Sequence, residues 1–380
     1  MPRSVGAAAG RRPDLEGGEG RARRPWQRRW GRRALGAVPA LLALLAALLT
    51  ACSFQSGDPQ DTLTVASDFN EKIFSLYSLV FWLAMAVFIV VEGLLIYSVI
   101  RFRRRPGDPL PPQMHGNNKL EVAWTIAPAL LLVLVAIPTL RTILETNRFK
   151  PAGPDVVEVR VVGWQFWWRI EYPEYGVVTS NEIHLPVGKT AVFTLEAAAP
   201  NQDYPEGFKA GSPQHSFWIP QMGGKQDILP NRTNRLSFTP RGTGTFSGQC
   251  AELCGTSHAN MRLRLVVQQQ ADFDAWVAQQ KQDAAAPTDD LAKRGQTNFG
   301  RCIGCHTIAG TNAQGVVAPN LTHFASRQTI AGIMDNTDEN LRRWITNPSA
   351  VKPGVKMPAF GDQLRPQDLD SIVAYLRSLK

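Results

Sequence analysis

Twelve residues of the chain concentrate four side chains that bind soft metal ions. They are two cysteines, a histidine and a methionine: Cys250, Cys254, His258 and Met261. Thiolate and imidazole alone would suit a zinc site with two cysteines and two histidines, whereas the added thioether favours copper. Two cysteines four residues apart allow both sulfurs to bridge a pair of copper ions, which requires a second imidazole. We expect His215 to supply it, and a zinc site remains the alternative.

A second cysteine pair has the pattern of covalent haem attachment. Cys302 and Cys305 are followed directly by His306. In a Cys-x-x-Cys-His motif each thiol forms a thioether with haem c, and the histidine becomes the proximal ligand of the iron. The alternative is a dithiol oxidoreductase motif, and the adjacent histidine argues against it.

The start of the chain is typical of a lipoprotein signal peptide. Arginine-rich residues are followed by an apolar run and then by Cys52, so residues 1–51 are predicted to be removed. Of the formal net charge of +9, these residues account for +7, with ten arginines against three acids, which leaves +2. A charge this small gives no support for nucleic-acid binding.

Residues 52–150 are predicted to form a transmembrane hairpin. Apolar segments near residues 73–100 and 122–144 are each long enough to cross a bilayer as a helix. The segment that joins them carries five basic residues: Arg101, Arg103, Arg104, Arg105 and Lys119. The positive-inside rule therefore places this loop in the cytoplasm and everything after residue 145 outside it.

The rest of the chain divides into a β part and a helical part. Residues 151–270 contain short alternating strands separated by glycine and proline turns, which predicts an all-β Greek-key domain. Residues 271–290 are predicted to be a linker, which begins with the tail of a helix and continues as a flexible tether. Residues 291–380 are predicted to be helical, with the haem motif after the first helix.

In its motifs and in the order of its parts, the chain resembles cytochrome c oxidase subunit II of the caa-type haem-copper oxidases, in which a cytochrome c domain is fused at the C-terminus. The resemblance covers nearly all of the mature chain. It implies a two-helix transmembrane hairpin, a cupredoxin-like Greek-key domain and an all-α class I cytochrome c domain. It also implies a multi-pass protein of the bacterial cell membrane, with both cofactor domains on the extracytoplasmic side.

The resemblance implies a binuclear copper centre called CuA. Two bridging cysteines, two terminal histidines and a methionine would bind it: Cys250, Cys254, His215, His258 and Met261. The backbone carbonyl of Glu252 would bind the second copper. The Glu252 carboxylate would reach a magnesium ion at the interface with subunit I.

The same resemblance identifies the distal ligand of haem c. Met357, in a loop with glycine and proline, matches the axial methionine of the family. Met334 is the competing methionine, and we expect it to belong to the core. With Cys302, Cys305 and His306, Met357 would complete the haem site.

Two further positions match functional places in the family. Glu121, at the cytoplasmic end of the second helix, matches an acid at the mouth of a proton channel into subunit I, although a helix dipole also favours a carboxylate there. Trp164, Phe166 and Trp168 match the aromatic stretch over the copper site. Phe166 takes the place of the tryptophan through which electrons enter.

The implied function is electron transfer from cytochrome c, through covalent haem c and CuA, to subunit I, which reduces oxygen to water with proton pumping. We expect no catalytic residue on this chain. The expected partners are oxidase subunits I and III and cytochrome c or another donor. The alternatives are the copper subunit of a nitric oxide reductase, a nitrous oxide reductase, a metal-free quinol oxidase subunit and a free-standing electron carrier in the membrane.

Overall fold

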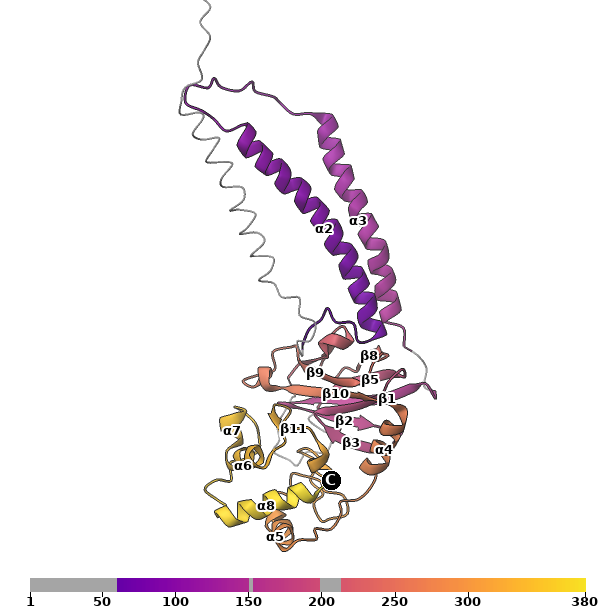
Figure 1. Ribbon diagram of the computed structural model, residues 1–380, viewed down its shortest axis with the longest axis vertical. Helices are drawn as coiled ribbons and strands as arrows, with labels where there is room; N and C mark the ends of the chain where they lie inside the picture. The colour runs from indigo at the N-terminus through magenta and orange to yellow at the C-terminus, as the bar shows by residue number, and fades with distance from the viewer. Residues whose placement is uncertain (1–59, 150–152, 199–212) are drawn as a thin grey trace, which may run out of the picture. The chain divides into compact units, whose positions relative to one another are not determined.

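The computed structural model of the chain describes residues 60–149, 153–198 and 213–380, which all belong to the unit Ser56–Lys380. The signal peptide predicted for residues 1–51 and the mature N-terminus at Cys52 lie outside these residues. Three parts follow one another along the described chain (Figure 1). They are a helical hairpin, a β domain and a C-terminal domain.

The hairpin consists of α2 (Asp68–Arg101) and α3 (Asn118–Thr146). Side chains of Ser67 and Asn117 cap the helix N-termini by accepting backbone hydrogen bonds. At 1.5 Å per residue the helices are about 51 Å and about 44 Å long, which exceeds the roughly 30 Å of a bilayer core. Their apolar side chains are largely exposed, as lipid contact requires. The predicted segments 73–100 and 122–144 lie inside these two helices.

The β domain contains two five-stranded sheets. The first has the strand order β3-β2-β1-β5-β8. Its strands are β1 (Val156–Trp164), β2 (Trp167–Tyr172), β3 (Val177–Ser180), β5 (Thr190–Ala197) and β8 (Asn234–Phe238). The second has the order β4-β10-β9-β6-β7. Its strands are β4 (Glu182–Pro186), β6 (His215–Trp218), β7 (Gln226–Ile228), β9 (Gly244–Cys250) and β10 (Arg262–Gln268).

The two sheets share an apolar core. Val159 and Val161 of β1 are buried at alternate positions, and Leu263, Leu265 and Val267 repeat the alternation in β10. Successive side chains of a strand point to opposite faces, so each sheet turns one apolar face inward. The all-β fold predicted from the alternating pattern is therefore confirmed, and it consists of two sheets.

A helix that packs on this domain occupies the first half of the predicted linker. Helix α4 (Gln270–Gln280) buries Phe273 and Val277 against the core of the β domain. Trp276 of α4 stacks on His184 of β4, with ring centroids 4.3 Å apart. The connection to the C-terminal domain is therefore residues 281–289.

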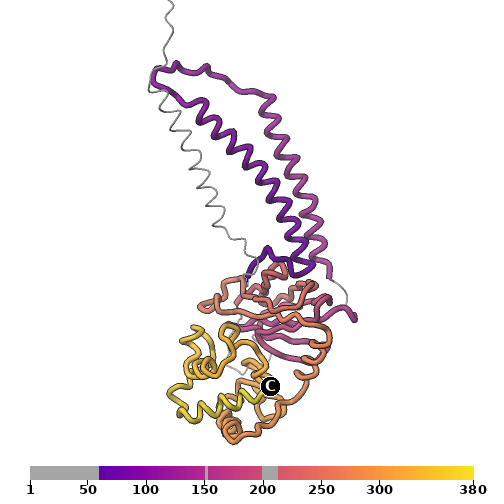
Figure 2. Tube along the Cα trace, viewed as in Figure 1, coloured from indigo at the N-terminus to yellow at the C-terminus, as the bar shows by residue number. Residues whose placement is uncertain are grey.

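The C-terminal domain is built from α5 (Asp290–Asn298), α6 (Asp338–Thr346), α7 (Pro348–Val351) and α8 (Pro366–Ser378), with a small ladder of β11 (Thr329–Ile330) and β12 (Met334–Asp335). The first and last helices pack against each other (Figure 2). A Cβ added at Gly295 of α5 would lie 1.8 Å from the carbonyl oxygen of Ser371 in α8. Only a glycine permits this helix contact.

Candidate metal centre and haem cavity

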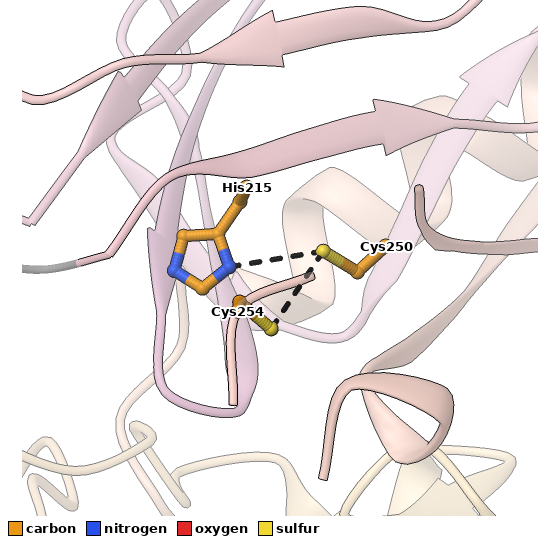
Figure 3. A group of neighbouring side chains, drawn as sticks. All are labelled: His215, Cys250 and Cys254. Carbon is orange, nitrogen blue, oxygen red and sulfur yellow. Dashed lines mark hydrogen bonds between the residues drawn. The ribbon is translucent and has the colours of Figure 1, made fainter. Parts of the chain in front are cut away.

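The second sheet brings three candidate ligands together. His215 begins β6 and Cys250 ends β9, and these strands are paired, so the two side chains meet at one end of the sheet. The Cys250 Sγ lies 3.8 Å from the His215 Nδ1 and 3.9 Å from the Cys254 Sγ (Figure 3). All three residues are buried, and their ligating atoms lie within 4.8 Å of one another.

The loop that contains both cysteines supplies the remaining candidates. We call residues 250–261 the ligand loop. The His258 Nδ1 and the Met261 Sδ each lie 3.8 Å from the Cys254 Sγ. The Glu252 carbonyl oxygen lies 3.2 Å from the Cys250 Sγ. Sulfur and nitrogen ligands at 2.0–2.3 Å from a tetrahedral ion lie about 3.3–3.8 Å apart, so these spacings suit metal binding.

Close backbone approaches hold the ligands in place. A Cβ added at Gly163 of β1 would lie 2.9 Å from the His215 ring, so the strand can pass directly over the imidazole. The Gln165 side-chain amide donates a hydrogen bond of 2.6 Å to the Cys254 carbonyl. The first sheet therefore positions one histidine and one cysteine of the second sheet's ligand set.

The pKa values of the two thiols are shifted in opposite directions. The hydrogen bond between the two sulfurs lowers the pKa of Cys250, although burial opposes this shift. The same contact, together with burial, raises the pKa of Cys254. Cysteine binds a metal as the thiolate, so a metal ion that binds both sulfurs must displace the protons that they carry.

The aromatic residues predicted near the site occupy different environments. Phe166 is 4% exposed and packs against the ligand loop, where a Cβ added at Gly255 would lie 3.0 Å from its ring. Trp168 is fully buried, with its ring centroid 6.0 Å from that of His215. Trp164 ends β1 and lines a cavity shared with the C-terminal domain.

That cavity, of about 260 Å³, contains the haem-binding motif. Cys302, Cys305 and His306 line it, and so does Met357. The His306 Nδ1 lies 2.8 Å from the Pro319 carbonyl oxygen, to which it donates, so its Nε2 is left as the ligand atom. Burial lowers the pKa of His306, which keeps the imidazole neutral as iron binding requires.

The competing methionine has a different setting. Met334 lies on β12 and packs against the core of the C-terminal domain. Leu321 and Trp344 line the cavity with Met357. The cavity is therefore bounded by the residues that the resemblance associates with haem.

One wall of the cavity comes from the β domain. Phe166 and Trp167 line it from that side, and Arg327 and Lys352 are two of the basic residues that line it from the C-terminal domain. Burial lowers the pKa of Arg327 to about 10 and that of Lys352 to about 7. Of these residues, the sequence predicts a role only for Phe166. The aromatic run that contains Trp167 is a signal in the sequence, but nothing in the sequence places Arg327 and Lys352 in a cavity wall.

The predicted proton residue lies apart from both sites along the chain. Glu121 is exposed in the first turn of α3, within the hairpin. Its carboxylate follows the Asn117 cap, where the helix dipole favours an acid. The role of Glu121 stays a prediction.

Family models match all three parts of the chain. The transmembrane domain of cytochrome c oxidase subunit II matches residues 60–142, and its periplasmic domain matches residues 208–269. A cytochrome c model matches residues 292–380. These matched regions follow the order of the hairpin, the β domain and the C-terminal domain.

Individual proteins show the same similarity. Cytochrome c oxidase subunit 2 of Alkalihalophilus pseudofirmus is 39% identical over 303 residues, which cover 77% of this chain and 83% of the relative. The subunit 2 of Bacillus subtilis is 33% identical over 360 residues, which cover 90% and 96%. A crystal structure of the periplasmic domain of subunit II of cytochrome oxidase from Bradyrhizobium japonicum is 27% identical, with a TM-score of 0.30, and covers 35% of this chain and 97% of that one.

Proposed function

The chain belongs to the cytochrome c oxidase subunit II family, and we propose that it delivers electrons from cytochrome c to an oxygen-reducing subunit I. It is a membrane protein and a subunit of an oxidoreductase, with a cytochrome c domain at its C-terminus. Its β domain and C-terminal domain are periplasmic. The observation that carries the proposal is the set of donors gathered around Cys250 and Cys254.

The number of donors favours a pair of copper ions over one zinc ion. Two copper ions held by Cys250 and Cys254 would need further ligands. His215, His258, Met261 and the Glu252 carbonyl are four such ligands, each within 4 Å of a cysteine sulfur. A single tetrahedral zinc ion would use only four of the six donors and would leave the thioether without a role.

The lining of the second cavity fits haem c. Cys302 and Cys305 would hold it through thioethers, and His306 and Met357 would bind its iron. Arg327 and Lys352 are basic residues in the cavity wall, and Lys352 is 2% exposed. Burying a cation is costly unless an anion lies near it, and Glu182 is such an anion for Arg327. The carboxylate groups of a haem would add negative charge beside Lys352.

When bound, the copper pair and the haem supply one-electron oxidation and reduction without an open coordination position for a substrate. The residues of the chain fix the ligands and exclude water. Pro319 orients His306 through its carbonyl, and Phe166 covers the ligand loop. A rigid, fully occupied set of ligands suits electron transfer rather than bond making, so oxygen reduction belongs to subunit I.

The remaining family roles form part of the same proposal. The Glu252 carboxylate would reach magnesium at the interface with subunit I, and Glu121 would lead protons into that subunit. The hairpin would hold the chain against subunits I and III in the bacterial cell membrane.

Metal analysis of paired cysteine variants tests the proposal. The unmodified chain should contain two copper ions and one covalent haem. Cys254→Ser should lose the mixed-valence copper absorption, because a hydroxyl is a poor bridge for soft copper, and should keep its haem. Cys305→Ser is the matched control, which should keep two copper ions and lose the thioether at that position.

Two outcomes would contradict the proposal. One zinc ion per chain in the unmodified protein would overturn the copper assignment. A co-purified catalytic subunit that reduces nitric oxide and consumes no oxygen would favour the nitric oxide reductase alternative.

A further inference from the structure

A loop of the C-terminal domain lies directly on the ligand loop. We call residues 352–357 the methionine loop, because Met357 ends it. The Pro353 carbonyl accepts a hydrogen bond of 2.6 Å from the Ser257 hydroxyl and one of 3.1 Å from the Thr256 hydroxyl. Ser257 has 0% of its surface exposed, so its hydroxyl cannot exchange Pro353 for water in this arrangement.

The contact joins the two segments that carry the proposed metal ligands. Ser257 directly precedes His258, and Pro353 lies four residues before Met357. One hydrogen bond therefore connects the segment that carries a proposed copper ligand with the segment that carries a proposed haem ligand. The sequence places these segments almost one hundred residues apart.

The two loops approach so closely that a side chain would not fit. Gly354 has a φ of +80°, and a Cβ added there would lie 2.4 Å from the Thr256 hydroxyl oxygen and 3.3 Å from the Phe166 ring. Glycine tolerates this backbone conformation and leaves the space that the approach needs. Phe166 therefore touches both loops, because it also packs on Gly255.

Buried hydrogen bonds fix both sides of this junction. Lys352 is 2% exposed, and its ammonium donates a bond of 2.8 Å to the Ala331 carbonyl, which holds the methionine loop to its own domain. Across the same interface, the Arg327 guanidinium donates to the Ser180 hydroxyl at 2.8 Å. The Gln328 backbone N–H donates to the Glu182 carboxylate at 3.0 Å.

We infer that Ser257 is a positioning residue, whose hydroxyl docks the methionine loop on the ligand loop and so fixes the distance between the two electron carriers. The inference rests on the proposed function. The surface of the β domain around Phe166 is occupied by the chain's own C-terminal domain and not by a separate cytochrome c. The residues 281–289 thus join two docked domains instead of letting one of them range freely.

Amide hydrogen exchange of the full chain in detergent tests this inference without depending on turnover. Ser257→Ala removes the 2.6 Å bond, and one hydrogen bond of ordinary strength changes an equilibrium by about twofold to tenfold. Exchange in residues 352–357 should rise by that factor. The copper and haem absorption of the variant should match those of the unmodified chain.

Ser216→Ala is the matched control. Ser216 is also buried and also adjoins a proposed ligand, His215, but its hydroxyl has no hydrogen-bond partner among the described residues. In Ser216→Ala, amide exchange in residues 352–357 should equal that of the unmodified chain. If Ser257→Ala does not fold, Gly354→Ala opens the same junction from the other side, because its new Cβ collides with the Thr256 hydroxyl.

A second readout separates positioning from simple stability. After rapid reduction of the haem, electron transfer to copper should be slower in Ser257→Ala, while reduction of the haem by an external donor should keep its rate. Unchanged exchange and unchanged transfer in a variant with full metal content would overturn the inference alone. An unmodified chain without two copper ions and a haem would instead overturn the proposed function.

Discussion

Acidification should destabilise the β domain through one partly buried histidine. His184 of β4 stacks on Trp276 of α4, with an angle of 10° between the rings, and its Nδ1 lies 3.4 Å from the Gln268 side-chain oxygen. Burial lowers the pKa of His184 from its ordinary 6.5 to about 4. The Glu182 carboxylate, 3.9 Å from the His184 Nε2, would favour the charged ring, but burial outweighs it.

The sign and size of the effect of pH on the unfolding free energy follow from the ordinary and the shifted pKa of His184. The unfolded chain binds a proton at His184 more tightly than the folded chain does, so the stabilising contribution is complete above pH 6.5 and is lost as the pH falls towards 4. A shift of one pKa unit corresponds to 1.36 kcal/mol. The difference between the pKa of 6.5 in the unfolded chain and about 4 in the folded chain therefore corresponds to about 3 kcal/mol of unfolding free energy. Burial raises the pKa of Glu182, whose contribution has the opposite sign and is lost as the pH rises.

The variant His184→Phe should flatten this dependence. Phenylalanine keeps the stack on Trp276 and never carries a charge, so the difference between variant and unmodified chain isolates the histidine. Urea unfolding, followed by tryptophan fluorescence from pH 7.5 to pH 4, measures the free energy. His115→Phe, in the loop between α2 and α3, is the control and should behave as the unmodified chain. Parallel curves for His184→Phe and the unmodified chain would refute the reasoning.

Three further predictions concern the helix contact, the haem ligand and the proton residue. Gly295→Ala should destabilise the C-terminal domain by about 1–3 kcal/mol, because its Cβ would collide with a carbonyl of α8. Thermal unfolding measures this loss of stability. Gly300→Ala is the control and should have no such effect, because its Cβ would meet no atom within 4 Å. Met357→Ala should remove the sulfur-to-iron absorption band and lower the haem potential, and Met334→Ala should do neither; the reverse result would make Met334 the ligand. Glu121→Gln should slow turnover of the assembled oxidase without changing transfer from haem to copper, whereas a carboxylate that only complements the helix dipole, worth about 0.3–1 kcal/mol, would leave turnover unaltered.

The sequence by itself determined the family, the fold classes and the candidate donors. Cys250, Cys254, His258 and Met261 lie within twelve residues, and the haem motif lies within five. Ligand sets this local are visible as spacing, because a short loop can bring its own side chains together. The two hairpin helices are equally local, since length and apolar composition decide whether a segment can cross a bilayer.

Only the tertiary structure decided which residues join the two soluble domains. Helix α4 stands within the predicted linker because Phe273 and Val277 find space on the β domain, and the sequence does not reveal that space. Lys352 is a basic residue, the type most often exposed, yet folding buries it in the wall of the haem cavity.

The junction of Ser257 with Pro353 shows the physical reason most directly. A serine and a proline about one hundred residues apart have no periodicity or motif that pairs them. Their contact depends on how two separately folded domains fit together, and that fit is set by the shapes of both surfaces. Local spacing therefore determined what each domain can bind, and tertiary packing decided how the two binding sites face each other.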